Sequence, residues 1–264
     1  MPVPEPVAFT IFGIDIMWYA VLITSGMIIA TVICCVRAPK HDLTSDQIIN
    51  FVIICIPAAI IGARLYYVVF NWEFYASDIK KILNIRGGGL AIHGGLIFAF
   101  VAVCILCAVW KLRPLNVLDL AAPCIAIAQA IGRWGNYFNS EAHGGPTDLP
   151  WAITVNGQSV HPTFLYESIW CFLLFFFLLW FAGKPRPQGR ILGAYVIAYA
   201  VIRFVLEFLR YDYERGILWV FSTSQWISLI LLPIGIWLLA RRAKAGKKPV
   251  SVEPAGAGEA VEKE

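Results

Sequence analysis

Seven stretches of mostly apolar residues follow one another along this chain, each about as long as the ~20 residues that a helix needs to span a bilayer. Hydrophobic residues make up 59% of the 264 residues, and charged residues only 14%. These proportions exclude a disordered chain, a soluble enzyme with one core and a nucleic-acid-binding protein. The sequence therefore predicts an all-α polytopic membrane protein with seven transmembrane helices. The predicted helices cover residues 16–36, 48–70, 88–110, 115–134, 164–182, 190–209 and 219–240.

The distribution of Lys and Arg between the loops predicts the orientation, because cytoplasmic loops are enriched in these cations. Thirteen of them lie in the first, third and fifth loops and in the tail, against five on the opposite side. The N-terminus is therefore expected outside and the C-terminus in the cytoplasm. The second loop, with Lys80, Lys81 and Arg86, runs against this rule.

The same pattern predicts a domain layout. Residues 1–240 form a transmembrane domain, and the loop at 135–163 is its small extracytoplasmic head segment. Within that loop we expect a hairpin over residues 151–160 that turns at Asn156-Gly157, a pair that suits a tight hairpin turn. The tail at 241–264 is rich in Ala, Gly, Lys and Glu, which is typical of a disordered cytoplasmic segment.

The seven cysteines all lie in predicted helices. Cys104 and Cys107 have the spacing of metal ligands, but their neighbours are aliphatic and no second pair exists. We interpret the cysteines as small apolar core residues and expect no metal site.

Charged and titratable side chains inside a membrane are costly and are usually functional. Since successive helices alternate in direction, six of the seven such residues are expected in the outer half of the bilayer, and only Asp119 near the cytoplasm. The six are Arg64, His93, Arg133, Glu167, Arg203 and Glu207. We interpret Asp119 as an N-terminal residue of its own helix, favoured by the helix dipole. Arg64 and Glu167 are interpreted as pairing partners that hold the helices in place.

Three of the polar residues share one helix face. Arg203, Glu207 and Arg210 are spaced i, i+4 and i+7, so Glu207 can hold both guanidinium groups while donors remain for an anion. The alternative is a ladder of ion pairs that only fixes helix packing.

His93 lies among five glycines in residues 87–95, which allow close approach of backbone or substrate. It is either a general base near neutral pH or a packed histidine that makes one hydrogen bond. Residues 132–144 carry Arg133, Asn136, Asn139 and Glu141 where a helix leaves the membrane. This segment either binds a phosphodiester or sugar at head-group depth, or simply terminates the helix.

The stretch GRWGNYFNSEAHG at 132–144 resembles the signature G-R-x-G-N-F-x-N-x-E-x-x-G of bacterial prolipoprotein diacylglyceryl transferases. Four further elements match in order, so the resemblance covers roughly residues 10–240. They are Trp18-Tyr19, HGGL at 93–96, HPTFLYE at 161–167, and Arg203, Glu207 and Arg210 at their spacing. Two positions depart from the pattern. Tyr137 replaces the usual Phe, and Phe164 replaces a Gln, so position 164 is given no binding role.

The resemblance implies an activity and a setting. It implies that the transmembrane domain moves the diacylglyceryl group of phosphatidylglycerol to the lipobox cysteine thiol of a preprolipoprotein signal peptide. A thioether forms and glycerol 1-phosphate leaves, with no metal or cofactor and no nucleic-acid partner. The setting implied is the lipid bilayer of the bacterial inner membrane, with the active site toward the extracytoplasmic leaflet. The functional positions carried over are Tyr19, His93, Arg133, Asn136, Glu141, Gly144, Arg203, Glu207 and Arg210.

In the mechanism expected from this reaction, negative charge develops on the departing phosphate, where arginine donors help most. Arg133 with Arg203 or Arg210 binds the phosphate, and either His93 or Glu207 assists deprotonation of the thiol. Three further residues orient the head group; they are Tyr19, Asn136 and Glu141.

Two other functions compete with this one. A secondary transporter or permease for an anionic solute also carries charges inside the membrane, but the chain has no internal repeat and its charges crowd one leaflet. Another lipid-modifying enzyme that acts on a phospholipid head group is the second alternative.

Overall fold

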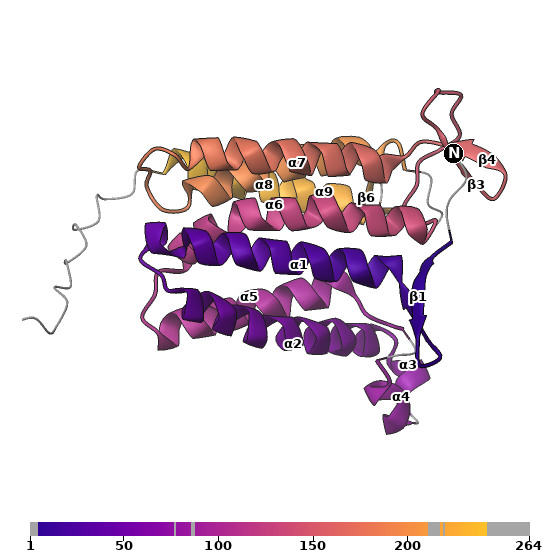
Figure 1. The fold of residues 1–264 in the computed structure, drawn as a ribbon, viewed down its shortest axis with the longest axis horizontal. Coiled ribbons are helices and arrows are strands. Elements are labelled where there is room, and N and C mark those ends of the chain that lie inside the picture. Colours follow the sequence, from indigo (N-terminus) through magenta and orange to yellow (C-terminus); the bar gives the residue numbers. More distant parts are fainter. Residues whose placement is uncertain (1–4, 77, 86–87, 211–216, 219, 242–264) are drawn as a thin grey trace, which may run out of the picture.

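The computed structural model describes residues 5–76, 78–85, 88–210, 217–218 and 220–241. Within these ranges, seven long helices lie side by side at the positions that the apolar stretches predict (Figure 1). They are α1 (Trp18–Arg37), α2 (Ser45–Phe70), α5 (Ile92–Val109), α6 (Pro114–Phe138), α7 (Thr163–Phe181), α8 (Arg190–Glu207) and α9 (Thr223–Ala240). Three shorter helices are η1 (Ala38–His41), α3 (Trp72–Tyr75) and α4 (Ile79–Leu83).

Six of the long helices are long and apolar enough to cross a membrane. The seventh, α8, has 18 residues but carries Arg190, Arg203 and Glu207. The prediction of a helical, multi-pass membrane protein is therefore confirmed. The seventh span, the disposition of the head segment and the orientation of the termini stay predictions.

Local sequence signals explain where the helices begin. A capping box starts α2, in which the Thr44 hydroxyl accepts from the Gln47 backbone N–H and the Gln47 side chain accepts from the Thr44 N–H. Ser222 and Gln225 form the same box before α9. The sequence placed the starts of α1, α5 and α9 too early. Gly88 and Gly89 have φ of +83° and +75°, so α5 begins at Ile92, and a strand pair precedes α9.

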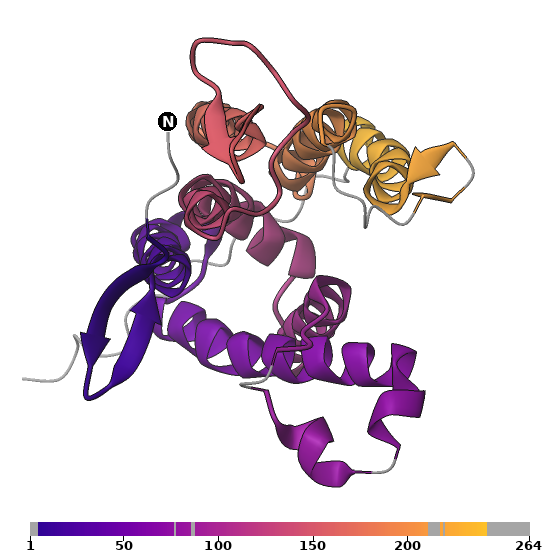
Figure 2. The ribbon, with the colours of Figure 1, turned by 90° about the vertical axis from the view of Figure 1, so that its right-hand side faces the viewer.

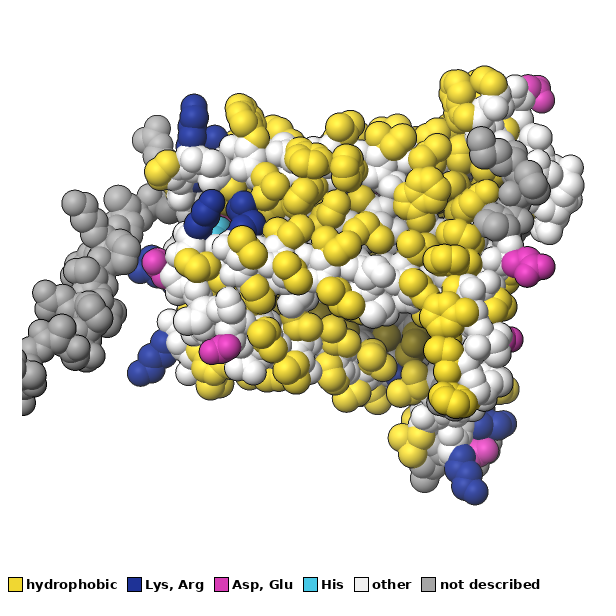
Figure 3. All heavy atoms as spheres, in the orientation of Figure 1, with side chains coloured by type: hydrophobic (Ala, Val, Ile, Leu, Met, Phe, Trp, Pro, Cys, Tyr) yellow, Lys and Arg dark blue, Asp and Glu magenta, His cyan; other side chains and the backbone are white. Residues whose placement is uncertain are grey.

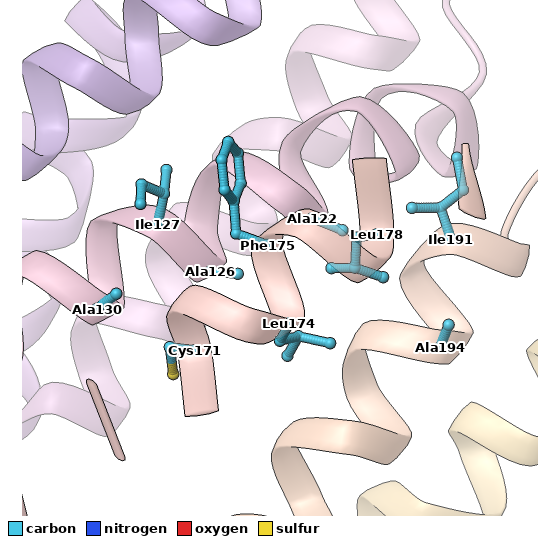
Figure 4. Close-up of a cluster of buried hydrophobic side chains, with 10 residues drawn as sticks. All are labelled: Ala122, Ala126, Ile127, Ala130, Cys171, Leu174, Phe175, Leu178, Ile191 and Ala194. Carbon is cyan, nitrogen blue, oxygen red and sulfur yellow. The ribbon is translucent and has the colours of Figure 1, made fainter. Parts of the chain in front are cut away.

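Two groups of helices are joined through the α1–α6 contact (Figures 1 and 2). On one side α2 packs against α5, and on the other α7, α8 and α9 pack in sequence beyond α6. The main apolar core lies on this second side (Figure 4). It consists of Ala122, Ala126, Ile127, Ala130, Cys171, Leu174, Phe175, Leu178, Ile191 and Ala194.

Three antiparallel hairpins lie at one end of the bundle (Figure 1). The predicted one is confirmed: β3 (Ile153–Val155) and β4 (Gln158–Val160) join at Asn156 and Gly157, whose φ values of +49° and +79° fit a tight turn. The other two were not predicted. They are β1 (Val7–Ile11) with β2 (Ile14–Met17), and β5 (Ile217–Leu218) with β6 (Phe221–Ser222).

The surface has the pattern of a membrane protein. In the face shown in Figure 3, apolar side chains cover the middle of the helices and charged ones gather toward the two ends. Large apolar side chains on the helices are freely accessible, with Trp180 70% exposed. The expectation of a disordered tail at 241–264 falls, except for Arg241, outside the described residues.

Candidate active site

The polar residues gather at one end of the bundle, as the alternation of helices predicts. Arg64 lies in the last two turns of α2 and His93 in the first turn of α5, and the others lie in the corresponding turns of α6, α7 and α8. This is the end that carries the hairpins (Figure 1). Asp119 lies near the opposite end, at the sixth residue of α6. The convergence at one end of the bundle is confirmed, while the depth in the bilayer and the side of the membrane stay predictions.

Glu167 is the centre of the charged cluster. Its side chain is buried, with the residue only 4% exposed, and it lies 2.6 Å from Arg133 Nη2 and 3.8 Å from Arg203 Nη1. The Tyr199 hydroxyl donates to Glu167 Oε1 at 2.9 Å and accepts from Arg133 Nη2 at 3.1 Å. One carboxylate thus orients two arginines from different helices, which fixes the relative positions of α6, α7 and α8 at this end.

Arg203 has a second set of contacts. Its Nη2 lies 3.1 Å from Glu207 Oε2 and donates to Ser224 Oγ at 3.0 Å. The predicted i, i+4 pair is therefore present. The backbone of Arg210 forms an antiparallel bridge with that of Gly144, which places Arg210 beside the 132–144 segment.

A tight, largely closed crevice lies between these groups. Three arginines and Glu167 contribute to its lining, and Glu207 also pairs with Arg203. Arginine side chains at such a place suit an anionic group. The lining of the crevice consists of Arg133, Asn136, Ala142, Thr163, Phe164, Glu167, Arg203, Leu206 and Arg210.

The 132–144 segment forms one wall of this pocket. Arg133 Nη1 donates to Asn136 Oδ1 at 3.5 Å, and Asn136 Nδ2 donates to Glu141 Oε1 at 2.9 Å. The chain can fold back in this way because Ser140 and Ala142 adopt left-handed backbone conformations, with φ of +53° and +56°. Arg133 and Glu141, which the sequence predicts as site residues, are thereby linked through Asn136 in one chain of hydrogen bonds.

Gly144 is needed for close packing. A Cβ there would lie 2.5 Å from His161 Cβ and 2.8 Å from the Leu209 carbonyl oxygen. The absence of a side chain lets the head segment pair with the end of α8.

Tyr19 lies beside the 132–144 segment, and His93 lies on α5 at the same end of the bundle. A Cβ on Gly135 would lie 2.7 Å from Tyr19 Cδ2, so the Tyr19 ring packs directly against α6 beside the 132–144 segment. His93 is exposed, and its ring lies 6.4 Å from that of Tyr66 on α2. Among the described residues, His93 makes no hydrogen bond or ion pair with the arginine cluster.

Comparison with known proteins identifies the family. The family model for prolipoprotein diacylglyceryl transferase matches residues 6–241. The chain is 46% identical over 249 residues to the phosphatidylglycerol–prolipoprotein diacylglyceryl transferase of Clostridioides difficile, covering 94% of this chain and 100% of that protein. For the protein of the same name from Finegoldia magna, the identity is 44% over 241 residues, which cover 91% and 96% of the two chains. The chain belongs to the prolipoprotein diacylglyceryl transferase family.

Two residues at the centre of the charged cluster were not predicted as site residues from the sequence. They are Glu167 and Tyr199. Glu167 was interpreted only as a pairing partner, a role that its ion pairs confirm. Tyr199 was missed, although Tyr199, Arg203 and Glu207 recur every four residues and so lie on one face of α8. That spacing was the signal that could have found it.

The two departures from the family pattern lie in contact. The rings of Tyr137 and Phe164 stack with their centroids 4.9 Å apart and their planes at 23°. Phe164 contributes an apolar side chain to the lining of the pocket.

Arg64 was expected to pair with an acidic side chain, and this expectation was wrong. Within the described part of the chain, the Arg64 side chain bonds backbone carbonyl groups rather than a carboxylate.

The expectation for Asp119 was also wrong. Asp119 accepts from the backbone N–H groups of Gly189 at 2.6 Å and Leu192 at 2.8 Å, so it caps the neighbouring helix α8. Its own helix begins five residues earlier, at Pro114.

Proposed function

We propose that this chain transfers the diacylglyceryl group of phosphatidylglycerol to the lipobox cysteine thiol in a preprolipoprotein signal peptide. The products are a thioether and glycerol 1-phosphate. Family membership supports this activity, and the transporter alternative is not favoured. The observation that carries the proposal is the pocket in which Arg133, Arg203 and Arg210 surround the buried Glu167.

The chemistry requires an anion site of this kind. The cysteine sulfur attacks the glycerol carbon, the bond from that carbon to the phosphate oxygen breaks, and the electron pair leaves with the phosphate. Negative charge therefore increases on the phosphate in the transition state. Arginine donors that are already oriented by carboxylates stabilise that charge without reorganisation. We assign phosphate binding to Arg133 and Arg203, with Arg210 as the third donor.

The thiol must lose its proton to attack. Glu207 is 4% exposed and paired with Arg203, which makes it a poor acceptor for a proton from an incoming substrate. His93 is exposed at the same end of the bundle, so it is the better candidate for the base. Glu207 then serves to orient Arg203.

The lipid substrate needs polar surroundings for its head group and apolar surroundings for its acyl chains. Asn136, Glu141 and Tyr19 lie beside the pocket and suit the glycerol hydroxyl groups of the lipid, while Gly144 brings the head segment close. An apolar cavity of about 480 Å³ lies between α1, α2, α5 and α6. It reaches Gln129, one helical turn from Arg133, and it has the size and lining to hold part of an acyl chain.

Orientation completes the proposal. We assign the site to the extracytoplasmic leaflet of the bacterial inner membrane, with α8 as the seventh span, residues 1–240 as the catalytic domain and the 241–264 tail in the cytoplasm. A fluorescent reporter that matures only in the cytoplasm, fused after Glu264, must then be bright. A dark but intact fusion contradicts this orientation.

The test is direct transfer. The enzyme is placed in liposomes that contain phosphatidylglycerol and a lipobox peptide, and mass spectrometry follows the cysteine. We expect a diacylglyceryl mass gain in the wild type and a loss of at least about 10²-fold in rate for Arg133→Ala. Arg113→Ala is the matched control, because this exposed arginine lies at the other end of the same helix. Folded wild-type protein that gives no mass gain, but carries solute across empty liposomes, contradicts the proposal.

A further inference from the structure

Arg64 holds four backbone carbonyl groups that lie between α2 and α5. Its Nε donates to Ile82 O at 2.9 Å, and Nη2 donates to Lys81 O at 2.6 Å. On the other side, Nη1 donates to Gly88 O at 2.7 Å and to Gly89 O at 2.9 Å. The residue is only 6% exposed, and its guanidinium carbon lies 5.0 Å from the centre of the Tyr75 ring.

This arrangement satisfies carbonyl groups that regular structure leaves without partners. Carbonyl groups in the last turn of a helix or in a loop take their donors from elsewhere. The planar guanidinium has five N–H donors directed around its rim, so a single side chain can serve two chain segments at once. Arg64 therefore ties the end of α4 and the glycine segment before α5 to the same point of α2.

The glycine segment is shaped to this contact. Gly89 has a φ of +75°, and a Cβ there would lie 2.5 Å from Arg64 Nη1 and 2.9 Å from Tyr67 Cε1. Gly88 has a similar φ of +83°, but a Cβ there would meet nothing within 4 Å. Of these two glycines, Gly89 alone has no room for a Cβ beside the arginine.

The segment that Arg64 holds continues directly into the turn of α5 that carries His93. Ala91 is the N-cap of α5, and its N–H donates at 3.0 Å to the carbonyl oxygen of Ala63, the residue before Arg64. Gly94 then packs against the Gly62 carbonyl and the Tyr66 side chain. His93 lies between these two contacts, so the position of its backbone depends on the same turn of α2.

We propose that Arg64 is a positioning residue for the transfer reaction. By holding the backbone of residues 81–82 and 88–89 it sets the first turn of α5, and through that turn the place of the His93 imidazole. This inference rests on the proposed function and on His93 as the base.

The test is a double-mutant cycle with kinetics. Arg64→Lys keeps the charge but cannot reach both carbonyl pairs. We expect it to lower kcat by about 10²-fold, the cost of a displacement of roughly 1 Å in a catalytic group. The KM for phosphatidylglycerol should stay within about twofold, because the phosphate pocket lies on α6, α7 and α8. In a His93→Gln background, Arg64→Lys should lower the residual rate by less than about twofold.

Two glycine variants provide an independent route if Arg64→Lys does not fold. Gly89→Ala pushes against Arg64 from the loop side and should reproduce the loss of kcat. Gly88→Ala carries the same backbone strain without the contact, so its loss should be clearly smaller. Lys80→Ala is a further control, because Lys80 is exposed on the same short helix α4 and does not bond Arg64 within the described residues.

The outcomes separate the two proposals. Equal losses in the wild-type and His93→Gln backgrounds, or a rise in KM with unchanged kcat, overturn the positioning role. Equal losses for Gly88→Ala and Gly89→Ala also overturn it. A folded wild type without any transfer contradicts the proposed function itself.

Discussion

Two arginine sites at the same end of the bundle differ in their acceptors. On α2, Arg64 is bonded to four neutral carbonyl groups of nearby loop backbone. On α6 and α8, Arg133 and Arg203 share the carboxylate of Glu167. Their side chains are also more accessible, at 25% and 15%.

This difference separates a structural arginine from one that can bind a ligand. The donors of Arg64 point into the protein and shape a loop. Arg133 and Arg203 line a crevice together with Arg210. Arginine donors that face a crevice suit an anionic group such as a phosphate.

The largest expected effect concerns the shared carboxylate. Glu167→Gln removes the charge that holds Arg133 and Arg203. It leaves the Arg133 guanidinium without its carboxylate partner, while Arg203 keeps Glu207. Breaking a buried pair in this way costs about 3–5 kcal/mol of stability. We expect a marked fall in the melting temperature in detergent and a loss of transfer.

Glu73→Gln is the control for this change, because Glu73 lies exposed on α3 at the same end of the bundle. A Glu167→Gln protein with the melting temperature and rate of the wild type would remove Glu167 from the centre of the proposed site.

The length of the apolar stretches and the alternating direction of successive helices made much of this fold predictable. Apolar stretches of sufficient length located all seven long helices, and helix direction located the end at which the charges meet. The i, i+4 rule also gave the Arg203–Glu207 pair. These are local properties, set by a few residues along one helix.

The predictions failed where a residue's partner comes from a distant part of the chain. Asp119 bonds the N-terminus of a helix 70 residues away, and Arg64 bonds a loop 17 to 25 residues away. Spacing along one helix contains no information about either contact. The β1–β2 hairpin was missed because its apolar residues merge with the first apolar stretch, so the sequence reads as an earlier helix start.

Asp119 offers a contrast at the opposite end of the bundle. Its carboxylate is 4% exposed and satisfies two N–H groups of α8. Asp119→Ala leaves these donors without a partner, which costs about 1–3 kcal/mol for a buried polar group. We expect a lower melting temperature with KM for phosphatidylglycerol unchanged, since the phosphate pocket is at the other end.

Asp148→Ala, in the exposed part of the head segment, should leave the melting temperature unchanged. A rise in KM for Asp119→Ala without loss of stability would show that the two ends of α8 are not independent, and the distinction between structural and ligand-binding charges would lose its support.

The smallest effect is expected in the head segment, where two glycines serve different purposes. Gly157 needs its φ of +79° but has open space around it, so Gly157→Ala meets only backbone strain of about 1–2 kcal/mol. This strain falls on an exposed hairpin, so the transfer rate should stay close to that of the wild type. Gly144 has no room for a Cβ between His161 and Leu209, and Gly144→Ala must push the head segment away from Arg210. Equal transfer rates for the two variants would contradict a role for the Gly144 contact in shaping the pocket.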